Sequence, residues 1–249
     1  MKISIITVTY NAQEFLKTCI ESVQQQIHPD IEYIVIDGRS TDDTLNIVAS
    51  YDNINQLVSE NDKGMYDALN KGIKLATGDI IGALNADDFF ASMQVVSQIS
   101  KAFEDSDTDI LYGDLLYVEK LDTSKVIRRW TSKPYKQGLF QWGWMPAHPT
   151  FYVRREVFEK YGNYRLDMGS AADYELMVRF LHKHRLKSLY LPQVMVKMRT
   201  GGVSNSSMHN RIQANIADLE AMKINGIMYP YLAVFLKPLR KIPQFFFNK

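Results

Sequence analysis

The sequence TGDIIGALNADD, residues 77–88, joins a short apolar run to a cluster of polar and acidic residues. The run DIIGAL at 79–84 has the length and apolar character of a buried strand. The carboxylates of Asp87 and Asp88 follow where this run ends. Ligands of open parallel α/β sheets bind beyond the carboxyl ends of the strands. The stretch therefore predicts a buried strand with a polar site at its end.

The same alternation of apolar runs and helical patterns fills the first hundred residues and is typical of successive βαβ units. Strands are expected at 3–8, 31–36, 56–59 and 79–84, and helices at 12–26, 42–50, 65–76 and 92–103. Asn11 with Glu14 resembles a capping box, and Ser40 or Thr41 can cap the second helix. We therefore predict an α/β fold with a mostly parallel, Rossmann-like sheet flanked by helices.

The pattern changes after Asp109. The expected elements are a hairpin at 110–118 and 125–131, an aromatic-rich loop at 134–149, a strand at 148–153, a helix at 172–184, strands at 186–191 and 194–199, and a loop at 199–207. A further helix runs from Met208 to about Asn225. We therefore divide the chain into two halves of one domain, 1–108 and 109–205, and a C-terminal tail, 206–249.

The composition is that of an ordinary folded protein. The 249 residues are 46% apolar and 23% charged, which suits one α/β core, and the net charge of +1 predicts no nucleic-acid partner. One cysteine, Cys19, excludes an intramolecular disulfide and a Cys-based zinc cluster, and its apolar helical stripe predicts a core position. Without a signal-peptide pattern or a run of ~18 apolar residues, a cytoplasmic location is expected.

Several polar residues follow the expected strands. Asp87 and Asp88 repel one another, and a hard divalent cation would remove that repulsion, although a solvated turn is a common alternative for such a pair. Asp37 directly follows the second strand and could accept a hydrogen bond from a nucleobase or ribose, or form a turn with Ser40. In the segment 59–72, Asp62 and Gly64 could approach a nucleotide; Asp67 and Asn70 share a helix face that could equally be a plain exposed one.

Five motifs in order carry a family resemblance: TVTYN (7–11), IDGRSTDDT (36–44), ENDKGMYDALNKG (60–72), TGDIIGALNADD (77–88) and SAADYELMVR (170–179). Together they resemble the family 2 glycosyltransferases, whose nucleotide-binding half has the GT-A fold, over roughly residues 1–205. The resemblance implies an inverting, metal-dependent transfer from a nucleotide diphosphate sugar, UDP first, to a saccharide or lipid-linked saccharide. It places residues 1–108 at the nucleotide sugar and 109–205 at the acceptor, and a role in bacterial surface polysaccharide biosynthesis follows by association.

The resemblance also assigns roles to individual residues. Thr9 and Asp37 would contact the base, and Asp62 the nucleoside. Asp87 would face the ribose and metal, and Asp88 would ligate Mn²⁺ or Mg²⁺. Because Asn85 stands where the Asp-x-Asp motif has its first acid, which carboxylate binds the metal directly is left open. The full set expected at the nucleotide sugar is Thr9, Tyr10, Asn11, Asp37, Ser40, Asp62, Gly64, Asp67, Asn70, Asn85, Asp87 and Arg199.

Asp173 is the expected catalytic base, at the start of the helix 172–184, which is anchored by an apolar face. The alternative for Asp173 is an N-cap. Glu175 is expected to pair with Arg179 four residues on.

Two loops have candidate roles beside this chemistry. The aromatic loop, with Tyr135, Phe140, Trp142, Trp144 and His148, could form an acceptor platform, although core packing is the likelier role for any single ring. Arg199 with Gly201, Gly202 and Ser204 could close over the diphosphate, or form a surface turn.

The tail mixes aromatic and basic residues: Tyr229, Tyr231, Phe235 and Phe245–Phe247 with Lys237, Arg240, Lys241 and Lys249. It could rest on an anionic membrane surface, pack on the core, or contact a second subunit in a homo-oligomer. The main alternative function is a noncatalytic nucleotide- or sugar-binding protein of the same fold. A dinucleotide-dependent oxidoreductase or a nucleotidyltransferase would need a glycine-rich loop after the first strand, where this chain has TYNAQEF.

Overall fold

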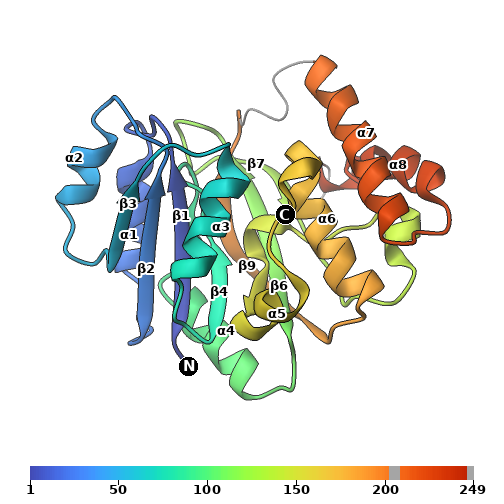
Figure 1. Cartoon of the computed structure of the whole chain (residues 1–249), viewed down its shortest axis with the longest axis horizontal. Coiled ribbons are helices and arrows are strands. Elements are labelled where there is room, and N and C mark those ends of the chain that lie inside the picture. Colours follow the sequence, from blue (N-terminus) through green and yellow to red (C-terminus); the bar gives the residue numbers. More distant parts are fainter. Residues whose placement is uncertain (202–207, 246–249) are drawn as a thin grey trace.

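The computed structural model describes residues 1–201 and 208–245, with the side chains of 208–211 left out. Within these residues nine strands form one mixed sheet (Figure 1). The strand order is β3-β2-β1-β4-β8-β6-β9-β5, and β7 pairs with β6. The sheet begins with four parallel strands; β8 then runs antiparallel to both β4 and β6, and β9 runs parallel to β6. The chain therefore combines a parallel half with a second half of mixed topology.

The parallel part follows the predicted βαβ pattern. Its strands are β1 (Ile3–Thr9), β2 (Ile31–Asp37), β3 (Gln56–Ser59) and β4 (Ile80–Ala83), and its helices are α1 (Leu16–Gln24), α2 (Thr44–Ala49), α3 (Met65–Leu75) and α4 (Val95–Glu104). The core strands are apolar because both faces of the sheet are covered by helices. Cys19 is fully buried on α1, as its stripe predicts.

Two predicted helix caps do not form. Helix α1 begins at Leu16, without a side-chain cap, because Asn11 adopts a left-handed conformation (φ 49°) and its Oδ1 accepts the N–H of Thr41 instead. Ser40 does not cap α2, since its hydroxyl donates to Asp37. The two loops that leave β1 and β2 are therefore tied to each other, and this cross-connection replaces local capping.

The second half corrects two strand assignments. It contains β6 (Ile110–Val118), β7 (Val126–Trp130), β8 (Tyr152–Arg154) and β9 (Ser188–Arg199), and β5 (Phe89–Phe90) from the first half pairs with β9. The predicted strand 148–153 is a 3₁₀ turn, His148–Thr150, followed by β8. The predicted strands 186–191 and 194–199 are one strand, whose register against β6 shifts between Tyr112 and Asp114. Pro192 lies in the shifted stretch, and a proline without an N–H is accommodated at such a bulge.

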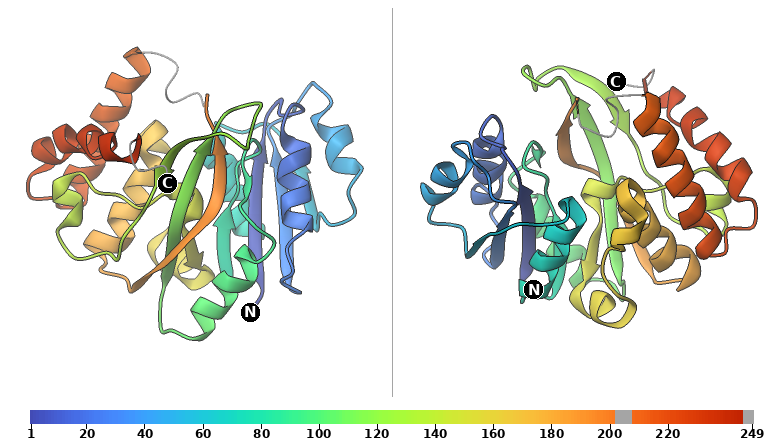
Figure 2. Two further views of the ribbon diagram at one scale, coloured as in Figure 1. Left: turned by 180° about the vertical axis from the view of Figure 1, so that it is seen from behind. Right: turned by 45° about the horizontal axis from the view of Figure 1, so that its top comes forward.

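Helices cover the second half on the side of α3 (Figure 2). They are α5 (Arg155–Tyr161), α6 (Ala172–Val178), α7 (Met208–Ile224) and α8 (Pro230–Leu239), and a π-helical turn, Arg179–Lys183, continues α6. The predicted pair forms: Arg179 donates to both carboxylate oxygens of buried Glu175, at 3.0 and 3.1 Å. Helix α8 was not predicted, because its three neighbouring prolines indicate a break; Pro230 instead occupies the first turn, where proline is tolerated. In the described ranges no helix is both long and apolar enough to span a bilayer.

A buried carboxylate joins β1, β2 and the start of β4. Glu32 accepts hydrogen bonds from Ser4 (2.6 Å), the Thr77 N–H (2.7 Å) and the Thr77 hydroxyl (2.6 Å), and pairs with Lys2 at 3.2 Å. Burial alone would raise the pKa of Glu32, but these hydrogen bonds lower it to about 2. The charged form is therefore the one that stabilises the fold.

We expect Glu32→Gln to lower the free energy of unfolding at pH 7 by about 2 kcal/mol, because the folded carboxylate has a lower pKa than an unfolded one. The folded pKa is depressed, so the contribution is complete above the unfolded value of 4.5 and is lost as the pH falls toward 2. Urea unfolding at pH 7 and pH 3 measures this, with Glu159→Gln, from an exposed pair, as the control. An equal loss at both pH values would contradict the assignment.

Candidate active site

The carboxyl ends of β1, β2 and β3 lie side by side, with Thr9 opposite Asp37 and Asp37 opposite Ser59. Buried Asp37 accepts hydrogen bonds from the hydroxyls of Thr9 (3.0 Å), Ser59 (2.6 Å) and Ser40 (2.5 Å), and from the Ser40 N–H (3.0 Å). Burial raises the pKa of Asp37, but the hydrogen bonds from Ser40, Ser59 and Thr9 lower it further than burial raises it. The turn role considered for Asp37 is present, and this charged side chain sets the shape of the strand edge.

An open surface lies beside Asp37. A Cβ atom on Gly38 would lie 2.6 Å from Oδ2 of Asp62 and 3.5 Å from the Tyr10 ring, so the Asp62 carboxylate could not keep this position beside a larger residue. Tyr10 is 68% exposed, and Oδ1 of Asp62 accepts the N–H of Gly64 at 2.8 Å. Gly64 has φ 109° and precedes α3. An exposed ring, a carboxylate and a helix N-terminus therefore adjoin one another, which suits a base, a ribose and a phosphate in turn.

Asp67 and Asn70 have other contacts. Asp67 accepts the N–H of Lys63 at 3.0 Å and lies 3.8 Å from the ammonium of Lys71, which keeps the loop before α3 in place. The amide of Asn70 donates to the Tyr164 carbonyl at 2.9 Å and accepts the Tyr164 N–H at 3.0 Å. Both side chains hold the site's framework together through these contacts, and their role at the nucleotide sugar stays a prediction.

The turn after β4 separates the two adjacent carboxylates. Asp88 is fully buried, with Oδ2 accepting from Asn85 (2.9 Å) and Oδ1 from the Arg199 N–H (3.2 Å). Asp87 is partly exposed. The Arg199 guanidinium lies between the rings of Phe15 and Phe89 and donates to the Asp87 carbonyl at 2.6 Å. Arg199 therefore fastens this turn to the end of β9, and its buried Nε has no hydrogen-bond partner among the described residues.

The carboxylate pair fits a divalent cation. Burial, and then the charge of Asp87, raise the pKa of Asp88 to about 8, and a cation would offset both effects. The described residues hold no group of three or more His, Cys, Asp or Glu side chains placed to bind a metal. Mg²⁺ commonly takes one or two carboxylates and completes its shell with water and substrate phosphate. The exposed Asp87 is the carboxylate able to reach such a cation, with Asp88 behind it.

Asp173 lies in the first turn of α6 and is not its N-cap; that position is Ala171, which makes no capping bond. The Asp173 side chain is 20% exposed, and its Oδ2 lies 3.6 Å from Nδ1 of His148. The Tyr66 hydroxyl donates to the carbonyl of Ser170 at 3.5 Å, which brings α3 against this turn.

The predicted aromatic platform divides into core and surface. Phe140 is fully buried and Trp144 is 7% exposed, and both pack in the core. Trp142 is 50% exposed. Tyr135 and His148 are partly exposed. Phe140 and Trp144 therefore join the loop to the core, and an acceptor platform at Tyr135, Trp142 and His148 stays a prediction. Gly202 and Ser204, predicted to close over the diphosphate with Arg199, lie outside the described residues.

The sequence analysis did not name two residues that lie at the candidate site. Tyr66 stands inside the 60–72 motif, and Tyr164 belongs to no local pattern. Both rings lie near Asp173, whose charge, added to the larger effect of burial, raises the pKa of each hydroxyl.

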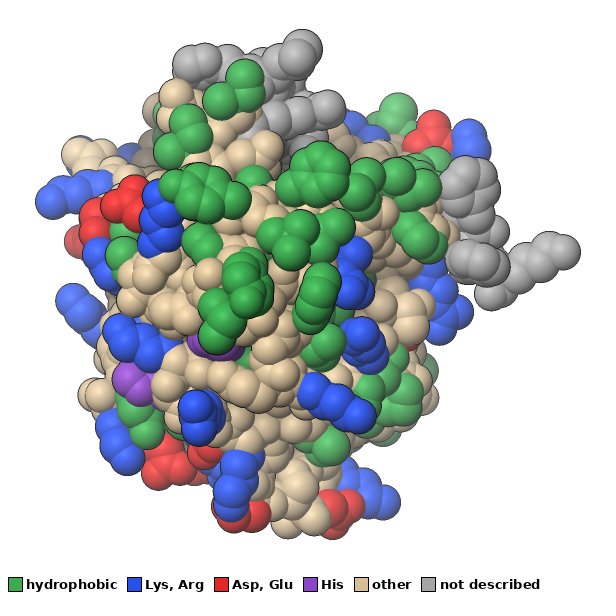
Figure 3. All heavy atoms as spheres, turned by 90° about the vertical axis from the view of Figure 1, so that its right-hand side faces the viewer, with side chains coloured by type: hydrophobic (Ala, Val, Ile, Leu, Met, Phe, Trp, Pro, Cys, Tyr) green, Lys and Arg blue, Asp and Glu red, His purple; other side chains and the backbone are tan. Residues whose placement is uncertain are grey.

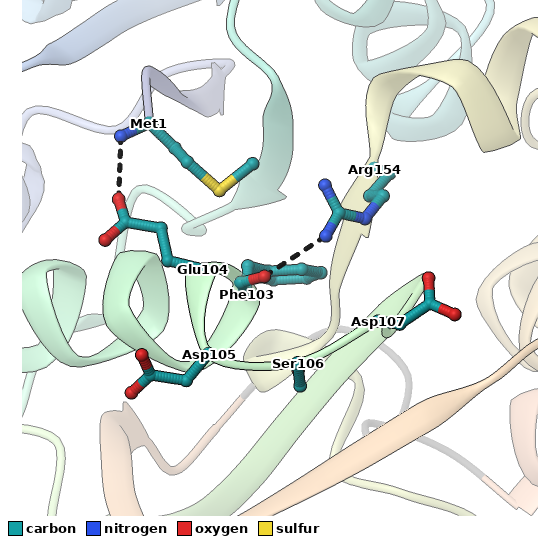
Figure 4. Close-up of a pocket in the computed structure, with 7 residues that line it drawn as sticks. All are labelled: Met1, Phe103, Glu104, Asp105, Ser106, Asp107 and Arg154. Carbon is teal, nitrogen blue, oxygen red and sulfur yellow. Dashed lines mark hydrogen bonds and ion pairs between the residues drawn. The ribbon is translucent and has the colours of Figure 1, made fainter.

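A hollow of about 570 Å³ elsewhere, drawn in Figure 4, is lined by Met1, Phe103, Glu104, Asp105, Ser106, Asp107 and Arg154. It adjoins the N-terminal end of β1, the edge opposite Asp37 and Asp87, and has no part in the site.

Comparison with known proteins agrees with this geometry. Residues 4–162 match the sequence profile of the family described as Glycosyl transferase family 2. The chain is 29% identical over 220 residues to a PGL/p-HBAD biosynthesis glycosyltransferase of Mycobacterium tuberculosis, covering 82% of this chain and 79% of the relative. It is also 29% identical over 233 residues to an uncharacterized glycosyltransferase of the same organism, covering 92% and 86%.

Two solved structures share the fold. Residues 1–349 of Staphylococcus aureus TarS, in complex with UDP-GlcNAc, superpose with a TM-score of 0.68 at 18% identity, covering 95% of this chain and 72% of that one. The mannosyltransferase PcManGT of Pyrobaculum calidifontis, in complex with GDP-Man and Mn²⁺, also gives 0.68, at 17% identity and covering 98% and 72%. The predicted GT-A-type α/β fold is confirmed.

Proposed function

The chain belongs to glycosyl transferase family 2, and from this membership we propose that it moves one sugar from a nucleotide diphosphate sugar to an acceptor hydroxyl, with inversion at the anomeric carbon. Glycosyltransferase activity follows from the family. The acceptor in this proposal is a saccharide or a lipid-linked saccharide, in a glycan biosynthesis context. The relative named for PGL/p-HBAD biosynthesis supports that context.

The observation that carries the proposal is the arrangement at the carboxyl edge of the sheet. Thr9, Tyr10 and Asp62 lie together on one side, and the Asn85–Asp88 turn follows the adjacent strand β4. A nucleotide diphosphate has a flat base, a ribose and a charged diphosphate in that order, so it can meet both groups at once. UDP is the first choice of nucleotide; the TarS complexes contain UDP or UDP-GlcNAc, while PcManGT binds GDP-Man.

Mn²⁺ or Mg²⁺ would be held by Asp87, with Asp88 behind it, and would supply charge stabilisation for the departing diphosphate. The chain itself contributes the rest of this environment. Arg199 holds the carboxylate turn in place, and the open N-terminus of α3 beside Gly64 offers N–H groups to a phosphate.

In the proposed reaction the acceptor hydroxyl attacks the anomeric carbon from the side opposite the diphosphate. As that bond forms, the bond to the diphosphate oxygen breaks, and Asp173 takes the proton of the hydroxyl. His148 and Tyr66 lie around Asp173 and restrict where its carboxylate can point. Such a base contributes typically ~10²–10⁴-fold to the rate.

Calorimetry with UDP, GDP and dTDP, each with and without Mn²⁺, tests the donor site. We expect one nucleotide to bind, at least ~10-fold more tightly with Mn²⁺, because a cation held by the carboxylate pair would offset the charge of the diphosphate. Release of that nucleotide from its sugar conjugates then tests turnover. Folded protein that binds none of the three would contradict the donor site. Binding without any turnover over a panel of acceptors would favour the noncatalytic alternative.

A further inference from the structure

The C-terminal helices expose an apolar surface that the transfer reaction does not use. Of the nineteen large apolar side chains exposed among the described residues, eleven lie in 212–245. Tyr231, Phe235 and Leu239 recur every four residues along α8 and are 69%, 67% and 45% exposed. They share one face of the helix, and Figure 3 shows the apolar side chains of this side of the molecule gathered together.

Helix α8 is apolar on both of its faces. Ala233 is fully buried and packs beside Gly143. A Cβ atom added to Gly143 would lie 2.5 Å from the backbone nitrogen of Lys237. That contact covers one face, while Tyr231, Phe235 and Leu239 leave the opposite face in solvent. A helix that is hydrophobic all round is normally covered on every side, so the exposed face indicates a missing partner.

The charges around this face indicate what the partner is. From residue 221 to residue 245 the chain has four basic residues, Lys223, Lys237, Arg240 and Lys241, and no acidic one, although its overall net charge is only +1. Lys237 pairs with Asp218 and lies over the Tyr174 ring, whereas Lys223, Arg240 and Lys241 have exposed side chains. Aromatic and aliphatic side chains with basic residues at their edge are complementary to an anionic lipid bilayer.

We propose that the exposed face of α8, with the adjoining residues Met228, Tyr229 and Ile242, lies on an anionic membrane surface. The apolar side chains enter the headgroup region, and Lys223, Arg240 and Lys241 bind lipid phosphates.

This face adjoins the acceptor side of the site. Arg240 donates to the carbonyl of Trp142, and Lys237 contacts Tyr174, next to Asp173 in sequence. Burial lowers the pKa of His148. The charge of Asp173 raises this pKa, whereas the charges of Lys237 and Lys241 lower it further. Helix α8 is therefore within electrostatic reach of His148. Membrane contact would hold Asp173 close to the lipid surface, where a lipid-linked hydroxyl would be presented.

Flotation with phosphatidylcholine vesicles, with and without ~30% phosphatidylglycerol, tests the proposal on the full chain. We expect binding to the anionic vesicles that weakens in high salt. Phe235→Ser with Leu239→Ser should lower partitioning at least ~10-fold, and Lys223→Gln with Lys241→Gln about fivefold for each charge. Leu121→Ser with Lys17→Gln, exposed residues outside this face, is the matched control and should bind like the unchanged chain.

Three results would overturn the proposal. One is absence of vesicle binding by the unchanged chain at low salt; another is an equal loss in the control variant. The third is a dimer, detected by light scattering, that dissociates in the Phe235→Ser, Leu239→Ser variant while no vesicle is bound, since the face would then belong to a second copy. The assay contains no donor or acceptor, so a chain that binds vesicles but transfers no sugar leaves this inference standing and refutes only the proposed function.

Discussion

Asp173→Asn is expected to lower kcat for sugar transfer ~10²–10⁴-fold, because the amide cannot take the proton of the acceptor hydroxyl. Nucleotide affinity should stay within about twofold, since Asp173 lies on α6 and the proposed nucleotide contacts lie at the ends of β1 to β4. Initial rates of nucleoside diphosphate release measure kcat, and calorimetry on the same preparation measures nucleotide affinity.

Asp167→Asn is the matched control for Asp173→Asn. Asp167 is an exposed carboxylate in the same segment, paired with Arg165, and its replacement should leave kcat within about twofold. If Asp173→Asn transferred sugar at the normal rate, the base would have to be another residue. If it lost both transfer and nucleotide binding, Asp173 would be supporting the fold of the site and would not be its base.

Asp87→Ala is expected to weaken nucleotide binding in Mn²⁺ by ~100-fold, to the level seen without metal, because it removes the exposed carboxylate of the pair. Asp88→Asn keeps the size of the buried side chain and an acceptor for one of its two hydrogen bonds, so a smaller loss, ~10-fold, is expected. Titrations of the nucleotide at a series of Mn²⁺ concentrations separate metal affinity from nucleotide affinity.

A remote carboxylate supplies the control for this pair. Asp105 lies near the opposite edge of the sheet. The Asp105→Ala variant should therefore bind nucleotide and metal like the unchanged chain. The reverse order, with Asp88→Asn abolishing the effect of Mn²⁺ and Asp87→Ala preserving it, would make Asp88 the direct ligand, as the family resemblance implies. Both variants keep Arg199 and its contact with the Asp87 carbonyl, so the turn is expected to stay folded.

Most of the parallel half could be predicted from local patterns. Apolar runs such as 31–36 and helical stripes such as 92–103 correspond to β2 and α4 because burial of these side chains is the same requirement in sequence and in structure. The ends of α1 and α2 could not be predicted in this way. Asn11 and Thr41 are thirty residues apart, and their hydrogen bond depends on how two loops meet. The strand 186–199 was divided at Pro192, where pairing with β6 carries the chain through a bulge.

The candidate site shows the same division. Asp37, Asp87 and Asp88 were predicted because each follows an expected strand, and parallel strands place their carboxyl ends together. Thr9 was predicted from the family resemblance alone. Asp67 and Asn70 share a helix face with no sign in the sequence that their polar groups are already occupied by Lys63 and Tyr164. A short-range pattern shows what a side chain can bind, but it does not show which residues contact that side chain in the folded protein.

The sequence by itself determined the α/β class, the order of the strands and helices in the parallel half, the family and the set of acidic residues at the strand ends. These depend on periodicity and on motifs, which are local properties. Only the tertiary structure decided which of two adjacent carboxylates is exposed, that His148 and Tyr66 surround Asp173, and that α8 has an uncovered apolar face beside the site. The physical reason is that burial and hydrogen-bond partners arise from segments such as β4 and β9, which are brought together by the sheet across more than a hundred residues of chain.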